Sequence, residues 1–213
     1  MSTRSPLLWL VGASGAAWIW SGIHPYDRGV WFFENVLGIA GVLLLVLTYR
    51  RFRFSNLVYV LVGIHVVILA MGAKYTYAEM PAFNWLRDTF GLARNYYDRV
   101  GHFAQGFFPA IMAREILLRT TALRPGKMLS FLVASVCLAM SAFYELIEWW
   151  IVLLFYPTEG PEWLGLQGDP WDAQQDMLMA LLGAVLALTL LSRAHDRSLR
   201  ALTEDTSRET VPS

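Results

Sequence analysis

Long apolar stretches alternate with short polar ones along most of the chain. A helix needs roughly 20 apolar residues to cross the hydrocarbon core of a bilayer, and it satisfies its own backbone hydrogen bonds there. Six stretches fit such a helix: Leu7–Ile23, Trp31–Thr48, Leu57–Ala73, Val100–Leu118, Met128–Tyr156 and Ala173–Ser192. The fifth is long enough that it must tilt or extend beyond the bilayer. The pattern therefore predicts an all-α integral membrane bundle of six transmembrane helices.

Two parts of this pattern allow a second interpretation. The first stretch resembles a signal peptide, but tryptophans flank or interrupt it and no convincing cleavage site follows, so we predict a retained helix. The long third connection mixes aromatic and charged residues between Phe83 and Arg94. This mixture favours a short helix lying at the outer membrane interface, and an irregular loop packed on the bundle is the alternative.

Composition agrees with a membrane location. Hydrophobic residues make up 56% of the 213 residues and charged residues only 16%, against about 25% charged in a typical soluble domain. Lys and Arg total 17 and balance 17 Asp and Glu, so no basic surplus suggests a nucleic-acid binder. The single cysteine, Cys137, excludes an intramolecular disulfide framework and a thiolate zinc cluster. We expect membrane lipids as partners and no nucleic acid, while the sequence indicates no protein partner.

Basic residues cluster in every second connection. They occur at 50–53, at 119–127 and at 193–200, whereas the connection after the fifth stretch carries only acidic charges, Glu159, Glu162, Asp169 and Asp172. Cytoplasmic loops of membrane proteins carry an excess of Lys and Arg. We therefore predict a multi-pass protein of the bacterial inner membrane with both termini in the cytoplasm. Residues 1–192 form one predicted transmembrane domain, and residues 193–213 form a polar cytoplasmic tail.

Ionisable residues occur in pairs near one end of the last three stretches. The pairs are Asp98 with His102, Glu145 with Glu148, and Asp172 with Asp176. Spacings of three or four residues place both side chains of a pair on one helical face. One member of each pair lies seventeen or eighteen residues from a basic residue near the other end of its helix. That separation is roughly 25 Å for each helix, so we predict a single layer just beneath the outer surface.

Five carboxylates and one imidazole in a single layer require compensating positive charge. The neighbouring arginines Arg87, Arg94 and Arg99 could supply it, and so could a metal ion. Carboxylate oxygens with one imidazole suit Zn, Mg, Mn or Fe. We therefore predict a divalent metal site with these ligands: Asp98, His102, Glu145, Glu148, Asp172 and Asp176. Glu145 and Glu148 are also the candidate general bases for attack by a metal-bound water on an ester or phosphoester.

Structural roles explain several of these residues equally well. Asp169 and Asp172 could cap the last helix, and Asp98 could cap the fourth. The whole layer could be a polar network that only fixes helix packing. We expect His24 and His65 to serve in packing or hydrogen bonding. Near the cytoplasmic side, we expect Arg114 and Glu115 to pair locally or to extend toward the interface.

Three segments together resemble a known family. They are RNYYDRVGHFAQGFFPA (94–110), FYELIEWW (143–150) and GDPWDAQQDMLMALLGA (168–184). In this order they resemble the YjdF-type bacterial inner-membrane proteins, a family with no settled activity, and more distantly the VanZ-like membrane proteins. The resemblance covers residues 84–191 strongly and the first three stretches only through hydropathy. It implies the same six site residues that the spacing singles out.

Three functions follow as hypotheses. The first is a membrane protein with an outward-facing carboxylate and histidine site that binds or acts on a lipid or lipid-linked headgroup. If it is an enzyme, a metal-dependent hydrolase or transferase fits best. The second is an ion- or proton-coupled transporter, because intramembrane carboxylates are common in such proteins. The third is a structural or partner-binding membrane protein without catalysis.

Overall fold

The structure, a computed structural model, describes residues 4–155 and 166–209, and within these ranges it is helical and contains no strand. Its seven α-helices and one short 3-10 helix are α1 (Arg4–Gly22), α2 (Arg28–Thr48), α3 (Asn56–Lys74), α4 (Pro81–Phe90), α5 (Tyr97–Thr120), α6 (Lys127–Phe155), η1 (Leu166–Gly168) and α8 (Asp172–Glu209). The predicted all-α class is confirmed. Glu159 and Glu162, two of the acidic residues used above for orientation, lie outside the described residues.

Each of the six apolar stretches coincides with a helix. Four helical segments are long and apolar enough to cross a membrane: α2, α3, α6 and residues 172–205 of α8. Helices α1 and α5 match the first and fourth stretches in position. Helix α5 carries Arg114 and Glu115 within its length, which lowers its hydropathy. A bundle of six membrane-crossing helices therefore stays a prediction.

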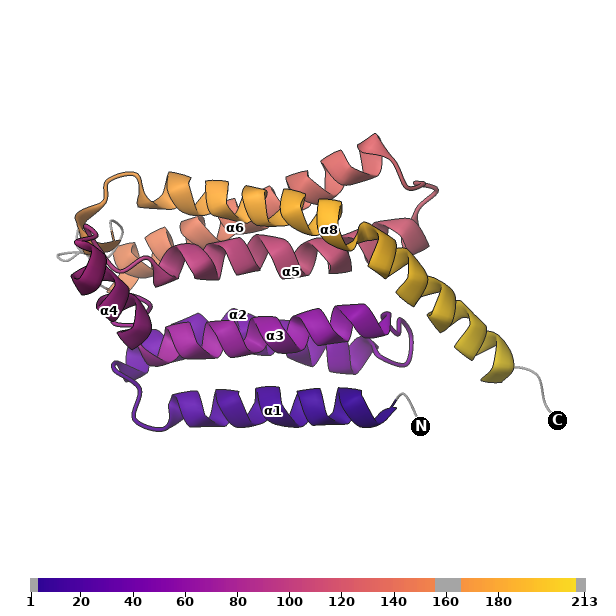
Figure 1. Cartoon of the computed structure of the whole chain (residues 1–213), viewed down its shortest axis with the longest axis horizontal. Helices are drawn as coiled ribbons and strands as arrows, with labels where there is room; N and C mark the ends of the chain where they lie inside the picture. Colours follow the sequence, from indigo (N-terminus) through magenta and orange to yellow (C-terminus); the bar gives the residue numbers. More distant parts are fainter. Residues whose placement is uncertain (1–3, 156–165, 210–213) are drawn as a thin grey trace.

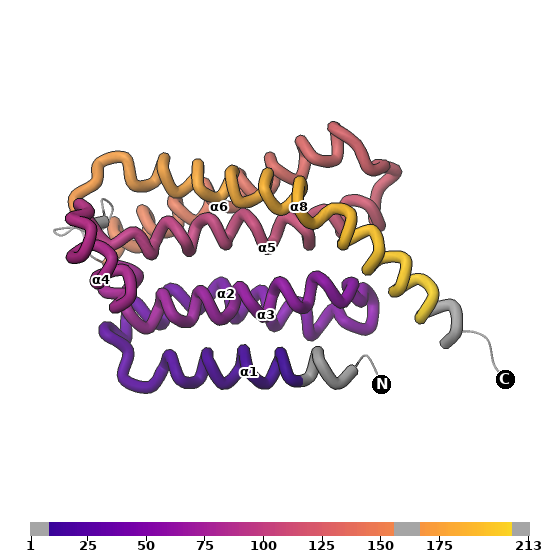
Figure 2. Tube along the Cα trace, in the orientation of Figure 1, coloured from indigo at the N-terminus to yellow at the C-terminus, as the bar shows by residue number. Residues whose placement is uncertain are grey.

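The long helices lie side by side along one direction (Figure 1). Helix α1 lies on one side, α2 and α3 lie in the middle, and α5, α6 and α8 form the other side, an arrangement that the trace in Figure 2 repeats. We call the end where α5 and α8 begin the acidic end, and the end where α2 stops and α3 begins the basic end. Helix α4 lies across the acidic end, whereas α1 begins and α8 ends toward the basic end.

Helices α5 and α8 run parallel, and their facing residues follow one another about one helical turn apart in each helix. Gly106 faces Ala180 so closely that a Cβ atom at Gly106 would overlap the carbonyl oxygen of Ala180. A Cβ atom at Gly183 would likewise overlap the carbonyl oxygen of Phe103. Small residues let helix backbones approach in this way. Since Asp98 and His102 precede Gly106 by two turns and one turn, the same register brings them opposite Asp172 and Asp176.

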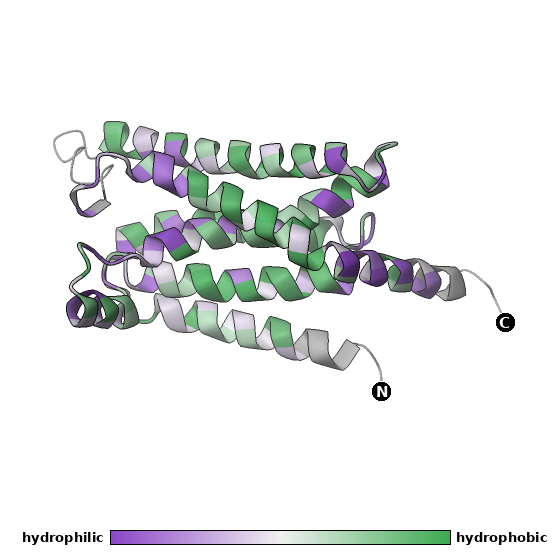
Figure 3. Cartoon of the chain, turned by 45° about the horizontal axis from the view of Figure 1, so that its top comes forward, coloured by the Kyte–Doolittle hydropathy of each residue, from purple (hydrophilic) through white to green (hydrophobic). Residues whose placement is uncertain are grey.

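Apolar packing joins α3, α5, α6 and α8 toward the basic end. Val58, Ile111, Leu129 and Val133 are at most 2% exposed and belong to one cluster. Helices α2 and α6 instead expose many large apolar side chains, as expected of surfaces that contact lipid. Figure 3 shows hydrophobic residues along the bundle and hydrophilic ones concentrated in α4 and in the C-terminal part of α8.

Helix α8 does not end where the apolar pattern ends. It continues without interruption from Asp172 through Ser192 to Glu209, and its C-terminal part projects beyond the bundle (Figure 1). His195, three residues past Ser192, has no exposed surface. The first residues of the expected tail are thus helical and packed. The division into a domain of residues 1–192 and a tail of residues 193–213 stays a prediction.

The short helix expected in the third connection is α4. Pro81 begins it, and Gly91, with a φ of 62°, ends it in the left-handed conformation that favours glycine. The Asn95 side chain then donates hydrogen bonds to the Met80 carbonyl at 3.0 Å and to Asn84 Oδ1 at 2.8 Å. These bonds hold α4 against the start of α5. Its location at the membrane interface stays a prediction.

Candidate functional site

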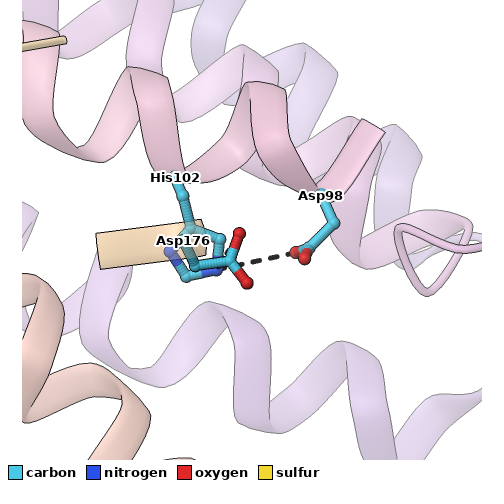
Figure 4. Close-up of side chains that lie close together, drawn as sticks. All are labelled: Asp98, His102 and Asp176. Atoms are coloured by element: carbon cyan, nitrogen blue, oxygen red, sulfur yellow. Dashed lines mark ion pairs between the residues drawn. The ribbon is translucent and has the colours of Figure 1, made fainter. Parts of the chain in front are cut away.

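Three of the predicted ligands meet at the acidic end. Asp98 and His102 project from consecutive turns of α5, and Asp176 reaches them from α8 (Figure 4). One ligand atom from each lies within 4.8 Å of the other two. His102 Nε2 is 3.6 Å from Asp98 Oδ1 and 3.9 Å from Asp176 Oδ1. The predicted gathering of acidic groups and an imidazole from separate helices is present here.

Glu145 of α6 approaches the other side of the same imidazole. His102 Nδ1 lies 3.7 Å from Glu145 Oε1, which is longer than a normal hydrogen bond. Both atoms are buried, and neither has a hydrogen-bond partner among the residues that the structure describes. A buried polar atom left without a partner costs about 1–3 kcal/mol. The imidazole therefore lies between carboxylates on both ring nitrogens, with unsatisfied bonding capacity on the Glu145 side.

Two arginines supply part of the positive charge that the sequence requires. Asp172 Oδ1 accepts hydrogen bonds from Arg94 and from Arg99, each at 2.7 Å. Arg99 also donates a short hydrogen bond to Asp176, and it lies 3.4 Å from Asp169. Asp172 is thus tied to two guanidinium groups, one of which, Arg99, also bonds Asp176 of the trio of Asp98, His102 and Asp176.

The charges at the acidic end do not balance through these arginines alone. Four aspartates lie within 4 Å of Arg94, Arg99 or both: Asp98, Asp169, Asp172 and Asp176. Glu145 adds a fifth carboxylate beside His102. Arg87 instead pairs with Asp88 of its own helix at 2.8 Å. The cluster therefore keeps a surplus of acidic groups, which favours protons or a bound cation.

Glu148 is the predicted site residue that has no direct contact with the trio. It lies three residues beyond Glu145 on α6, nearer the acidic end, and is partly buried. Within the part of the chain that the structure describes, it makes no hydrogen bond or ion pair. Its predicted roles as ligand and general base therefore stay predictions.

The chain before α8 is attached to the start of α5. The Gln167 side chain accepts a hydrogen bond from the Asn95 backbone N–H and donates one to the Asn95 carbonyl, both at 2.9 Å. Asp169 Oδ1 accepts from the Trp171 backbone N–H at 2.9 Å, which supports the capping role considered for Asp169. These contacts fix where α8 begins, and so they fix the height of Asp172 and Asp176 beside α5.

Sequence reasoning missed Glu34, a carboxylate of α2 that lies next to this cluster. Tyr144 of α6 donates its hydroxyl hydrogen bond to Glu34 Oε2 at 2.8 Å, and its ring meets the edge of the His102 ring at a centroid distance of 5.9 Å. A signal for Glu34 was available. It lies seventeen residues from Arg51, the same separation that placed His102 and Asp176 in one layer.

A second buried polar cluster lies toward the basic end. His195 Nε2 is 3.0 Å from Glu115 Oε2, and neither residue has exposed surface. Glu115 Oε1 also accepts from the Ser55 backbone N–H at 2.9 Å and from Arg119 at 2.8 Å. Arg114 pairs with Asp196 at 2.8 Å. The expected local pairing therefore holds for Glu115, which bonds Arg119 one turn along α5. Glu115 also contacts His195 of α8, and Arg114 pairs with Asp196 of α8, because that helix continues past Ser192.

The two remaining histidines that the sequence analysis considered lie apart from both clusters. His65 stacks on Phe108 at a ring-centroid distance of 5.5 Å, in agreement with the expected packing role. Over residues 4–155 and 166–209, its buried Nε2 has no hydrogen-bond partner. His24 lies exposed in the connection between α1 and α2 with a φ of 52°.

Comparison with known proteins gives two matches and one absence. The family model described as "Predicted membrane protein (DUF2238)" matches residues 6–197. The chain is 46% identical over 182 residues to "Inner membrane protein YjdF" of Escherichia coli (strain K12). The matched region covers 85% of this chain and 87% of that protein. No solved structure matches. Similarity to VanZ-like proteins stays a prediction. Both matches extend over most of the chain, which therefore belongs to the DUF2238 family of membrane proteins.

Proposed function

We propose that this protein is a multi-pass inner-membrane protein that binds one divalent metal ion at Asp98, His102 and Asp176. The ion would hold an anionic lipid or lipid-linked headgroup at the acidic end. The observation that carries the proposal is the pair of unpartnered buried atoms, His102 Nδ1 and Glu145 Oε1, beside a cluster with a surplus of carboxylates.

The separations from His102 to the two aspartates fit a shared ion. Ligand atoms bound at about 2.1 Å lie at most about 4.2 Å apart across one metal. His102 Nε2 lies 3.6 Å from one aspartate oxygen and 3.9 Å from the other. Nδ1 on the opposite side of the ring points toward Glu145. A carboxylate behind a metal-bound histidine orients the ring and raises its basicity, so Glu145 is better suited to positioning His102 than to binding the ion.

The donor set limits the choice of metal and leaves room for a ligand. Two carboxylates and one imidazole suit Zn, Mn, Fe or Mg. Three protein ligands leave at least one coordination position open on any of these ions. A phosphate oxygen of a headgroup would fill such a position. We retain Glu145 and Glu148 as the candidate general bases if the protein also catalyses hydrolysis or transfer.

Metal analysis of the purified protein tests this proposal. We expect about one Zn, Mn, Fe or Mg per chain after chelation and reloading, measured by inductively coupled plasma mass spectrometry. Asp98→Asn, His102→Asn and Asp176→Asn should each lose the metal. Glu145→Gln should weaken metal affinity about 10–100-fold, as loss of an orienting carboxylate does elsewhere.

The matched control for His102→Asn is His24→Asn, because it removes an exposed histidine and asparagine tolerates the positive φ found there. It should leave the metal content unchanged. Equal metal content in His24→Asn and His102→Asn, or no metal with any of the four ions, would contradict the proposal.

A purely structural network is the second candidate, favoured by the ion pairs of Arg94 and Arg99. It predicts lower thermal stability in the aspartate variants with no dependence on metal.

The proposed orientation places the acidic end outside and both termini in the cytoplasm, because the arginine-rich connections lie at the other end. The only cysteine, Cys137, is 3% exposed, so an introduced cysteine can be detected alone. In spheroplasts, a membrane-impermeant maleimide should label Trp171→Cys without lysis and Arg197→Cys only after lysis. The reverse pattern would contradict the orientation while leaving the metal site untouched.

A further inference from the structure

A pocket at the basic end is surrounded by arginines. Its volume is about 640 Å³. Arg50, Arg51 and Arg53 line it from the connection between α2 and α3, Arg119 lines it from the end of α5, and Arg200 lines it from α8. The pocket is separate from the acidic-end cluster and from the proposed metal site, and most of its lining lies within the residues that the family model matches.

We propose that this pocket binds the phosphate of an anionic phospholipid in the leaflet that faces the basic end. Arginine presents a planar fork of donors that matches phosphate oxygens. Basic pockets between membrane helices at the cytoplasmic side are suited to anionic headgroups. The pocket also has an apolar wall that includes Leu118, Leu199 and Leu202. This wall favours a lipid over free phosphate, because it offers contact area for the apolar part of the molecule.

The charge around the pocket favours an anion, although Arg53 lies 3.5 Å from Asp205 and Arg119 lies 2.8 Å from Glu115. Asp196 is the one acidic residue among the described residues that line it, and it already pairs with Arg114 at 2.8 Å. Over residues 4–155 and 166–209, the side chains of Arg50, Arg51 and Arg200 make no ion pair. Several guanidinium groups around one pocket repel each other, and a bound phosphate relieves that repulsion.

Arg53 and Arg119 form a fixed side of the pocket. Arg119 donates hydrogen bonds to the Arg53 carbonyl at 2.6 Å and to Glu115 at 2.8 Å, and its guanidinium lies 3.9 Å from the centre of the Phe52 ring. The Nε of Arg53 is buried and has no hydrogen-bond partner within the described part of the chain, while its Nη2 lies 3.5 Å from Asp205. This side is therefore preorganised, and the exposed Arg51 and Arg200 are free to close on a ligand.

Native mass spectrometry of the full chain tests the proposal. The protein, released from phosphatidylcholine nanodiscs, is titrated with phosphatidylglycerol and separately with phosphatidylcholine. The lining variant carries Arg51→Gln and Arg200→Gln. The matched control carries Arg193→Gln and Arg197→Gln, which remove two exposed charges from α8 outside the pocket. We expect the lining variant to bind phosphatidylglycerol at least about tenfold more weakly, and the control to stay within about twofold.

Three further results decide whether the bound phosphate belongs to a lipid or to a soluble anion, and whether the pocket is where it binds. Inorganic phosphate is titrated calorimetrically in phosphatidylcholine nanodiscs. If phosphate binds with the same arginine dependence while phosphatidylglycerol shows no preference, the lipid assignment is overturned in favour of a soluble anion. Equal loss in the lining and control variants would overturn the pocket in favour of diffuse surface charge. If the lining variant has a lowered thermal midpoint, Arg200→Gln alone replaces it, and unchanged phosphatidylglycerol binding in that variant overturns the proposal.

Discussion

Replacing Gly106 with alanine should destabilise the protein by about 3 kcal/mol or more, at the upper end of the range for overpacking. The added methyl group would overlap the carbonyl oxygen of Ala180, which is backbone and cannot rotate away. Helices α5 and α8 would have to move apart. His102 and Asp98, which precede Gly106 by one and two turns, would then move away from α8 as well. We therefore expect a lower thermal midpoint in detergent and, if the proposed metal site exists, loss of its metal.

Gly41→Ala is the control for this substitution. Gly41 lies within α2, and a Cβ atom there would meet nothing within 4 Å. Alanine is favoured over glycine in a helix by up to about 1 kcal/mol, so this variant should be as stable as the parent chain or slightly more stable. A Gly106→Ala protein with an unchanged midpoint would show that the close contact between α5 and α8 does not exist.

Replacing Arg99 with methionine should have a comparably large effect. Arg99 contacts Asp98, Asp169, Asp172 and Asp176, and its side chain is 9% exposed. Removing one partner from a buried ion pair costs about 3–5 kcal/mol, because the other charge stays buried without compensation. We expect this loss in a thermal or denaturant unfolding experiment on the protein in detergent.

Arg87→Met serves as the comparison, because the exposed Asp88 of its own helix is the one ion-pair partner of Arg87 among the described residues. An exposed pair of this kind contributes about 0–1 kcal/mol. Adding Asp172→Asn to Arg99→Met should recover part of the lost stability, since it removes one of the uncompensated acids. Equal effects of Arg99→Met and Arg87→Met would mean that the arginine is not buried among the aspartates as described.

The height of the acidic cluster could be predicted because the helical rise is constant. Counting residues from a basic end to His102 and Asp176 needs no knowledge of packing, and the structure places these two side chains together. Contact between them also requires that α5 and α8 face each other, and spacing alone does not give that. The pattern of small residues at Gly106, Ala180 and Gly183 carries this information.

Charge partners were harder to predict. Arg94 and Arg99 were candidates to compensate the acids, but their division between Asp172 and Asp176 depends on the exact rotation of α5. The polar composition after Ser192 predicts a solvent-exposed tail, whereas α8 continues through this segment. In this segment the buried His195 contacts Glu115. A single buried position produces no repeating hydropathy pattern, so the sequence does not reveal it.

The uninterrupted course of α8 restricts how the protein can move. The same helix holds Asp176 beside His102 at one end and His195 beside Glu115 at the other. Sliding α8 along α5 by one turn would displace it by about 5.4 Å. That shift would pull both contacts apart together and would drive Gly183 off the Phe103 backbone. Opening of either end must therefore come from its neighbours, α4 and α6 at one end and the arginine-rich connection at the other, while α5 and α8 move as a single rigid unit.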